Sequence, residues 1–305
     1  MYQKMVVLLD GSELAEVVFD YARELSGRVN VDVDLLHVCR PQDVSQLPMR
    51  RAYMERMAEE LCAGAEEIRA KYGKDAKAQC VQARGHVVVG YPAEEIIRYI
   101  EENDIDLVMM STHGSSGVRA WDLGEVANKV VHASRAPVWL VPAELREEII
   151  ADVMPERVLV VPLSGSKQST AAIPHATEIM TRRGAEAELL LLHVVDPYSV
   201  SASVYLTRAA LDSLDERREQ MKRYLEEVAQ PLRESGMLVE TEVLTGDPAE
   251  TIIDYLKSHP TQLVVMATRG KRGLSRMVFG SVTESVIHMV KVTPLLLVEG
   301  GEGGD

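Results

Sequence analysis

The sequence predicts an α/β protein made of two tandem doubly wound domains, each a five-stranded parallel sheet flanked by helices. Short apolar runs alternate along the whole chain with segments of 3- and 4-residue apolar spacing, and the same order of elements occurs twice. Strands that alternate with helices form parallel sheets with right-handed crossovers. The 305 residues are enough for two such cores. We expect the strand order 3-2-1-4-5 in each sheet, which puts a ligand crevice beyond the carboxyl ends of strands 1 and 4.

The first half begins with an apolar run that predicts a buried strand at residues 4–9, and Asp10-Gly11-Ser12 ends this strand. Ser12 is placed to cap the helix that follows. The later elements follow from the same two periodicities. They are a helix at 14–25, a strand at 31–38, a loop at 41–48, a helix at 51–72, a strand at 78–88, a helix at 92–102, a strand at 107–110, a helix at 124–132 and a strand at 137–141.

The second half repeats this order at a constant spacing. Five markers recur 156 residues apart: His37 and His193, Gly90 and Gly246, Gly114 and Gly270, Gly124 and Gly280, and His132 and His288. Several markers at one spacing indicate a duplicated domain. We therefore expect domains at residues 1–142 and 156–299, joined by a charged linker. The glycine-rich residues 300–305 are expected to form a disordered tail.

Composition limits the classes of partner. The net charge is −14, from 33 basic and 47 acidic residues, which argues against nucleic acid as a partner. The three cysteines have no Cys-x-x-Cys spacing, which favours reduced thiols in a cytoplasmic protein. No apolar run reaches the roughly 20 residues of a membrane span, and no signal peptide is evident. No residues have metal-ligand spacing, so we expect no metal site formed by the chain alone.

A basic glycine-rich loop stands out against this acidic background. It connects an apolar run, residues 263–267, to a helical pattern that starts near Val282, and it contains Arg269, Lys271, Arg272 and Arg276. A strand, a glycine-rich loop and a helix start form an anion site, because backbone N–H groups and the positive end of the helix point at the bound group. Ser281-Val-Thr-Glu284 also fits a helix capping box, which would explain the serine without a ligand.

With these motifs the chain resembles the universal stress protein family in its tandem two-domain form. The nucleotide motif of that family is Gly-x2-Gly-x9-Gly-Ser/Thr after strand 4, and the second half has Ala267-x2-Gly270-x9-Gly280-Ser281. The family also has Asp-Gly-Ser after strand 1, Leu-His-Val at the end of strand 2 and a Gly-x-Pro-Ala helix start. ATP-binding members carry the motif, so the resemblance implies an ATP site, with or without Mg²⁺.

The resemblance also implies which residues contact the nucleotide in the second half. Adenine and ribose are expected between the loop after strand 1 and the end of strand 2, and the phosphates on the glycine loop and the following helix start. The residues implied are Pro162, Leu163, Ser164, Val194, Met266, Ala267, Arg269, Gly270, Arg272, Gly280, Ser281 and Val282. Two of them depart from the family. Ala267 replaces a glycine and could crowd the ribose, and Ser164 replaces an aspartate and loses one carboxylate contact.

The first half carries the altered motif Ser111-x2-Gly114-x9-Gly124-Glu125. Glu125 occupies the helix start, where its carboxylate would repel a nearby phosphate by about 4 kcal/mol at an effective dielectric of about 20. Arg119 is the only Lys or Arg in this loop, and Asp122 opposes it. We predict that this half lost nucleotide binding or binds a nucleoside without phosphates. Its weaker site candidates are Asp10, Val38, Gly114 and Gly124.

The resemblance thus implies an ATP-binding regulatory protein of the stress response, and the comparison of the two motifs puts the binding mainly in the C-terminal half. No side chain has the neighbours of an activated nucleophile or general base, so we expect no catalytic residue and slow or absent turnover. A slow ATPase, autokinase or adenylyl-transferring enzyme is one alternative, and a scaffold with two vestigial pockets is another. The family resemblance implies that the last strands, residues 138–141 and 295–298, pair in an intramolecular pseudo-dimer and that the chain forms a homo-oligomer.

Overall fold

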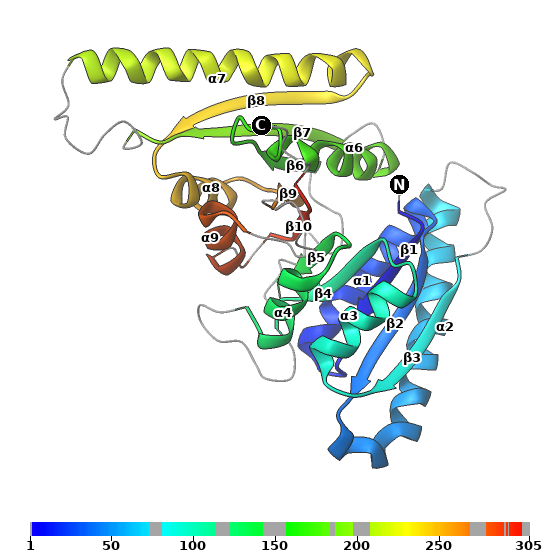
Figure 1. The fold of residues 1–305 in the computed structure, drawn as a ribbon. Coiled ribbons are helices and arrows are strands. Elements are labelled where there is room, and N and C mark those ends of the chain that lie inside the picture. Colours follow the sequence, from blue (N-terminus) through cyan, green and yellow to red (C-terminus); the bar gives the residue numbers. More distant parts are fainter. Residues whose placement is uncertain are drawn as a thin grey trace.

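A computed structural model describes residues 2–72, 81–113, 123–142, 157–183, 187–197, 208–268, 279–289, 291 and 293–300. The first half, from dark blue to green in Figure 1, contains five strands. Its elements are β1 (Lys4–Leu8), α1 (Glu13–Val29), β2 (Asp32–Cys39), the 3-10 helix η1 (Pro41–Gln46), α2 (Leu47–Tyr72), β3 (Ala83–Val89), α3 (Pro92–Glu102), β4 (Leu107–Ser111), α4 (Glu125–Ala133) and β5 (Val138–Val141).

The second half, from green to red in Figure 1, repeats the order of the first. Its elements are β6 (Arg157–Pro162), the 3-10 helix η2 (Ser169–Ala171), α6 (Ala172–Arg183), β7 (Ala187–Val195), α7 (Arg208–Glu234), β8 (Leu238–Thr245), α8 (Pro248–Ser258), β9 (Leu263–Ala267), α9 (Ser281–Met289) and β10 (Leu295–Val298). The linker 143–156 and the tail residues 301–305 lie outside the described residues.

All ten strands form one sheet in the order β3-β2-β1-β4-β5-β10-β9-β6-β7-β8. Within each half the strands are parallel and follow the predicted order 3-2-1-4-5. The halves meet where β5 and β10 pair antiparallel, with Leu140 opposite Leu295 and Val138 opposite Leu297. Because β5 and β10 pair with each other, neither strand offers a free edge to a second chain.

The predicted loop at 41–48 is wrong. Residues 41–46 form η1, and α2 begins at Leu47. Pro41 lies at the start of η1, where its fixed φ suits a helix and its missing N–H is not needed. The Cys39 thiol also donates to the carbonyl of Asp43, 3.3 Å away, which ties the short helix to the end of β2. The prediction that Ser12 caps the first helix is confirmed, because its side chain accepts from the Ala15 amide.

Helices cover both faces of the sheet. One apolar cluster contains residues of α1, α2, α6 and α7, and the other contains residues of α3, α4, α8 and α9. Successive residues of β1 belong to opposite clusters, Met5 and Val7 to the first and Val6 and Leu8 to the second. Strands covered on both faces explain the nearly continuous apolar runs in the sequence. Among the described helices, none is both long and apolar enough to span a bilayer.

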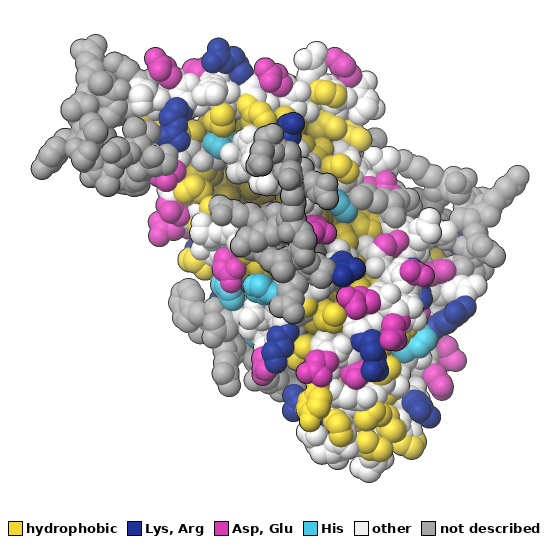
Figure 2. Space-filling model, in the orientation of Figure 1, with side chains coloured by type: hydrophobic (Ala, Val, Ile, Leu, Met, Phe, Trp, Pro, Cys, Tyr) yellow, Lys and Arg dark blue, Asp and Glu magenta, His cyan; other side chains and the backbone are white. Residues whose placement is uncertain are grey.

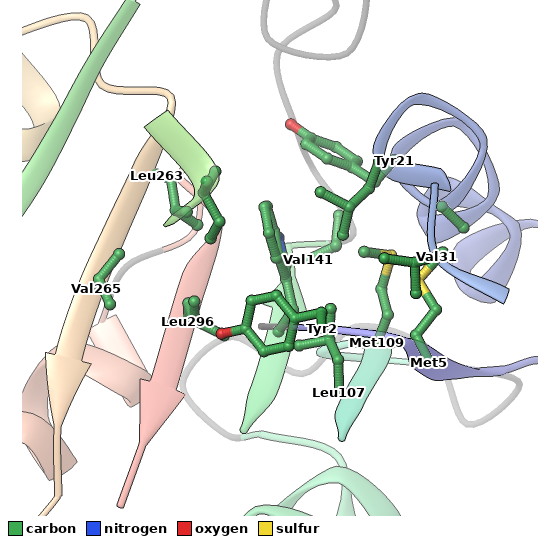
Figure 3. Packing of buried hydrophobic residues seen from close by; sticks show 14 of the residues in the cluster. Tyr2, Met5, Tyr21, Val31, Leu107, Met109, Val141, Leu263, Val265 and Leu296 are labelled. Carbon is green, nitrogen blue, oxygen red and sulfur yellow. The ribbon is translucent and has the colours of Figure 1, made fainter. Parts of the chain in front are cut away.

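The first apolar cluster runs across the junction of the halves. Figure 3 shows Tyr2 and Leu107 of the first half beside Leu296 of the second. The Tyr2 hydroxyl lies 2.6 Å from Nδ1 of His175, a residue of α6. On the face shown in Figure 2, the described acidic and basic side chains are interspersed and form no basic stripe. Each of the two apolar clusters contains residues of both halves.

Candidate functional site

The candidate nucleotide site lies at the carboxyl ends of β6 and β9. These strands are neighbours and run parallel, with Leu159 opposite Leu263 and Val160 opposite Val264. The chain leaves β6 toward β7 on one side, and β9 is followed by β10 on the other. The chain order of the strands therefore changes direction between β6 and β9, which is where doubly wound sheets bind ligands.

Several predicted residues are brought together here. Val194 and Met266 are buried in one apolar cluster, and Val282 packs against it from α9. Leu163 is buried on the opposite face of the sheet, where Ala267 packs against the other cluster. Pro162 is the last residue of β6. These positions lie near the carboxyl ends of β6, β7 and β9 and are divided between the two faces of the sheet.

The loop after β6 is held by serines. The Ser164 hydroxyl lies 2.9 Å from the Ser166 hydroxyl, and the Ser164 amide donates to the Ser169 hydroxyl over 3.2 Å. Gly165 has φ of +84°, a left-handed conformation that favours glycine. Ser164 is exposed at the position where the family has aspartate. It can offer a hydroxyl to a ligand, but no charge.

The sequence predicts that the phosphates lie at the start of α9, and this segment has the following geometry. The helix begins at Ser281, which is exposed, and the Gly280 carbonyl accepts from the Glu284 amide over 2.9 Å. The Glu284 carboxylate lies 3.5 Å from Nε2 of His288 and 4.0 Å from Nε2 of His132. Among the described residues it makes no bond to the Ser281 amide, so the capping box does not account for this serine.

The glycine loop itself is only partly described. Arg269, Gly270 and Arg272 lie outside the described residues. Thr268, the last residue described before this loop, is 1% exposed, and its hydroxyl has no hydrogen-bond partner among the described residues. On the other side of the loop, Phe279 packs edge-on against His132 of the first half, with ring centroids 4.6 Å apart. This contact joins the start of the α9 segment to α4.

Sequence reasoning missed an arginine beside the end of β7. His193 Nδ1 lies 2.7 Å from the Leu163 carbonyl. Burial lowers the pKa of His193, the hydrogen bond partly opposes this, and the nearby Arg217 lowers the pKa further. Arg217 comes from α7 and donates to the Asp196 carbonyl over 3.3 Å. The sequence could have indicated Arg217 only by showing which face of α7 points toward the sheet. Charged residues occur on several faces of this helix, so the pattern does not single out Arg217.

The first half contains a pocket of about 390 Å³ at the equivalent place. It brings together Asp10, Val38 and Gly124, three of the four candidates from the sequence. The fourth, Gly114, lies outside the described residues. His37 also lines the pocket, with Nδ1 2.9 Å from the Leu9 carbonyl. Burial lowers the pKa of His37, a shift that this hydrogen bond opposes and Arg50 reinforces.

Two cations of this pocket come from a different part of the chain than the glycine loop. Arg40 follows β2 and Arg50 lies on α2, and both line the pocket. Nη1 of Arg50 lies directly over Gly11, where a side chain would collide with it. Arg50 also donates to Gln46 over 3.2 Å. Both arginines lie outside the loop after strand 4, where the glycine motif is found, and so no motif indicates them.

The repulsion predicted for Glu125 is too large. Its side chain is 82% exposed, and it accepts from Nζ of Lys129, one helical turn later, over 2.7 Å. This hydrogen bond and the charge of Lys129 lower the pKa of Glu125, and Arg40 adds to the effect. A carboxylate that is solvated and paired repels a neighbouring anion weakly. Glu125 therefore does not by itself close the first pocket to an anion.

In the described part of the chain, no cluster of three or more His, Cys, Asp or Glu side chains is arranged to hold a metal ion. The duplicated sheet defines a tandem doubly wound α/β protein, a class of fold whose ligands bind beyond the carboxyl ends of the strands. A profile described as "Universal stress protein family" matches residues 1–142 and again residues 156–299. The chain belongs to the universal stress protein family.

Similar proteins agree with this membership. A universal stress protein of Methanocaldococcus jannaschii is 34% identical over 143 residues, which are 46% of this chain and 81% of the relative. A universal stress protein of Mycobacterium tuberculosis is 23% identical over 300 residues, 94% of each chain. The crystal structure of a universal stress protein from Archaeoglobus fulgidus aligns over 98% of both chains with a TM-score of 0.62 and 22% identity, which supports the fold alone.

Proposed function

We propose that this chain is a regulatory protein of the stress response that binds ATP in its C-terminal half. The observation that carries the proposal is the exposed start of α9 at Ser281, which follows the carboxyl end of β9 in the chain. A helix start with Gly280 and a serine hydroxyl suits a phosphate. Family membership supports a nucleotide as the ligand. The buried Thr268 hydroxyl supports a polar ligand or loop contact at the same place.

The proposed regulatory function also rests on a side-chain contact between the two halves. Phe279, just before Gly280, contacts His132 of the first half. An occupied phosphate site would order the α9 start, and this contact would transmit the change to α4. We further propose that the paired halves act as a pseudo-dimer. A homo-oligomer would have to use a surface other than β5 or β10, since these strands are already paired.

Titration calorimetry of the full chain, purified without nucleotide, tests the proposal. We expect one ATP site per chain, measured with and without Mg²⁺, and weaker binding of adenosine because the phosphates contribute contacts. The absence of any heat would contradict nucleotide binding and favour the scaffold alternative. Two equal sites would contradict the C-terminal preference. Analysis of the nucleotide after incubation separates the remaining alternatives, because released ADP or AMP, or label on the protein, indicates an enzyme.

Arg217→Ala is expected to weaken ATP binding about fivefold, because a guanidinium close to the end of β7 adds a favourable charge to the crevice. The measurement is the same titration. Arg223→Ala is the matched control, since Arg223 is an exposed arginine farther along α7. If both substitutions weaken binding equally, the effect comes from net charge, and Arg217 has no special place in the site.

A further inference from the structure

The duplication allows a second region of the two halves to be compared residue by residue. The Asp106 amide donates to the Lys4 carbonyl, and the Gln262 amide donates to the Val158 carbonyl in the same way. Lys4 and Val158 are therefore equivalent. In the neighbouring strands Asp34 lies opposite Arg84, as Leu190 lies opposite Glu240. All these positions lie near the amino ends of the strands. The candidate nucleotide site lies at the opposite, carboxyl ends.

In the first half the chain supplies its own cation to this region. Nζ of Lys4 lies 2.7 Å from the Asp34 carboxylate, which is almost fully buried. The Tyr99 hydroxyl donates to Asp34 over 2.9 Å, and Nε2 of His86 lies 3.3 Å from it. The ammonium, the phenol and the imidazole therefore all contact the same carboxylate. An ammonium group held by a carboxylate and by the Asn103 carbonyl, 3.4 Å away, is thus present within this fold.

In the second half both members of the ion pair are missing. Val158 replaces Lys4 and Leu190 replaces Asp34, and both line a pocket of about 510 Å³. Three carboxylates line the same pocket: Glu188, Glu240 and Glu242. Glu242 occupies the position of His86, and Glu240 that of Arg84. The second half has therefore lost the internal ammonium and gained negative charge around its place.

An aromatic pair completes the pocket. Tyr255, the equivalent of Tyr99, stacks on His259 with ring centroids 3.9 Å apart and an angle of 7° between the planes. Burial raises the pKa of Tyr255 to about 12, and the charges of Glu242, Glu188 and Glu240, which line the same pocket, add to the shift. Among the lining residues that the structure describes there is no lysine or arginine. Arg233, near Glu240, donates instead to Glu226 and to the Val239 carbonyl.

We propose that this pocket binds an aliphatic polyamine. Its ammonium groups replace the missing lysine ammonium and contact the separate carboxylates of Glu240 and Glu242. Its methylene segments cover Val158 and Leu190, which form an apolar wall that a hydrated metal ion would not use. The faces of the Tyr255 and His259 rings add a favourable surface for an organic cation. The pocket is separate from the nucleotide crevice, so the two proposals stand independently.

The test is calorimetric titration of the full chain with spermidine in nucleotide-free buffer, because polyamines also pair with phosphates in solution. We expect saturable binding, and about tenfold weaker binding for Glu240→Gln and for Glu242→Gln. Glu250→Gln is the matched control, because it removes one charge from the exposed start of α8 outside the pocket. Equal weakening by all three substitutions would overturn the proposal, because it would show attraction to net charge alone. No binding up to about 10 mM spermidine would also overturn it.

A second variant rebuilds the first-half network in the second half. Val158→Lys with Leu190→Asp places an internal ammonium and its carboxylate in the pocket. We expect this double variant to lose spermidine binding while the thermal melting curve remains cooperative. Unchanged spermidine affinity in the folded double variant would contradict the proposed location. Should the double variant fail to fold, the two glutamine variants and their control decide the question. A neutral diol of similar length, 1,4-butanediol, should not bind, and binding equal to that of putrescine would contradict recognition of the ammonium groups.

Discussion

Replacing Ser281 by Glu is expected to lower the affinity for ATP by about 30-fold, which corresponds to about 2 kcal/mol. Ser281 is the exposed first residue of α9, where backbone N–H groups and the helix dipole favour an anion. A glutamate would remove the hydroxyl and bring a negative charge to the same place. The carboxylate would then compete with the phosphates for the helix end and repel them. Calorimetry of the full chain measures the change.

A glutamate at position 281 should repel phosphates more strongly than Glu125 does at the equivalent helix start of the first half. Glu125 is paired with Lys129 four residues later, whereas Ser285 stands at that spacing after Ser281. A glutamate at 281 would therefore lack a neutralising partner. Adding Ser285→Lys to Ser281→Glu should restore part of the affinity, because a Glu–Lys pair at this spacing screens the charge.

Two outcomes would contradict this prediction. Gln230→Glu adds the same charge on the exposed surface of α7, far along the chain from the candidate site, and should leave the affinity unchanged. An equal loss in this control would assign the effect to net charge. Unchanged affinity in Ser281→Glu itself would mean that the nucleotide does not use the start of α9, and the second-half proposal would fail.

Most of the fold was predictable because it depends on local patterns. The apolar runs of β1 and β7 and the helical spacing of α1 are properties of consecutive residues, and the parallel arrangement follows from their alternation. The duplication then indicated that the order of strands and helices is the same in both halves. The segment at 41–48 was mispredicted because its polar sequence and two prolines are typical of a loop, while the contact of η1 with the Cys39 thiol of β2 is not visible in the local pattern.

The candidate site was less predictable because its charges come from distant segments. Arg50 lines the first-half pocket and Arg217 lies beside the end of β7, and both come from long helices that no motif marks. The repulsion by Glu125 was overestimated because its pairing with Lys129 is a side-chain property. The equivalence of Lys4 and Val158 was hidden for a different reason. The first strands of the halves lie 154 residues apart, as shown by the equivalent acceptors Leu9 and Leu163, whereas the histidines that bond to them lie 156 apart.

The buried network around Asp34 leads to the second prediction of large effect. Asp34 is 4% exposed and is bonded to Lys4, His86 and Tyr99. Asp34→Leu would leave these groups without their acceptor, and Lys4 would keep a charge at the margin of the core. Since the Lys4 side chain is 33% exposed and partly solvated, we expect a loss of about 2–3 kcal/mol of stability. The melting temperature should fall by about 5 °C.

The same carboxylate makes stability depend on pH. Burial alone would raise the pKa of Asp34, but the hydrogen bonds from His86, Lys4 and Tyr99 outweigh it and lower the pKa to about 2. Because the folded pKa lies below the unfolded value of about 3.9, the contribution is fully present above about pH 4 and is lost as pH falls toward 2. The difference between the two pKa values corresponds to about 2–3 kcal/mol of stability. The melting temperatures of the parent chain and Asp34→Leu should therefore converge as pH is lowered through this range.

The second half provides the matched variant for this prediction. Lys4→Val with Asp34→Leu installs the pair that the duplicate carries at Val158 and Leu190, and it removes the lysine together with its partner. We expect the double variant to recover about half of the stability lost in Asp34→Leu. Asp20→Asn, which breaks an exposed ion pair with Arg23, should change stability by less than about 1 kcal/mol. If the double variant were no more stable than Asp34→Leu, the cost would come from packing of the leucine. The loss of the ion pair would then not explain why the two halves diverged at this position.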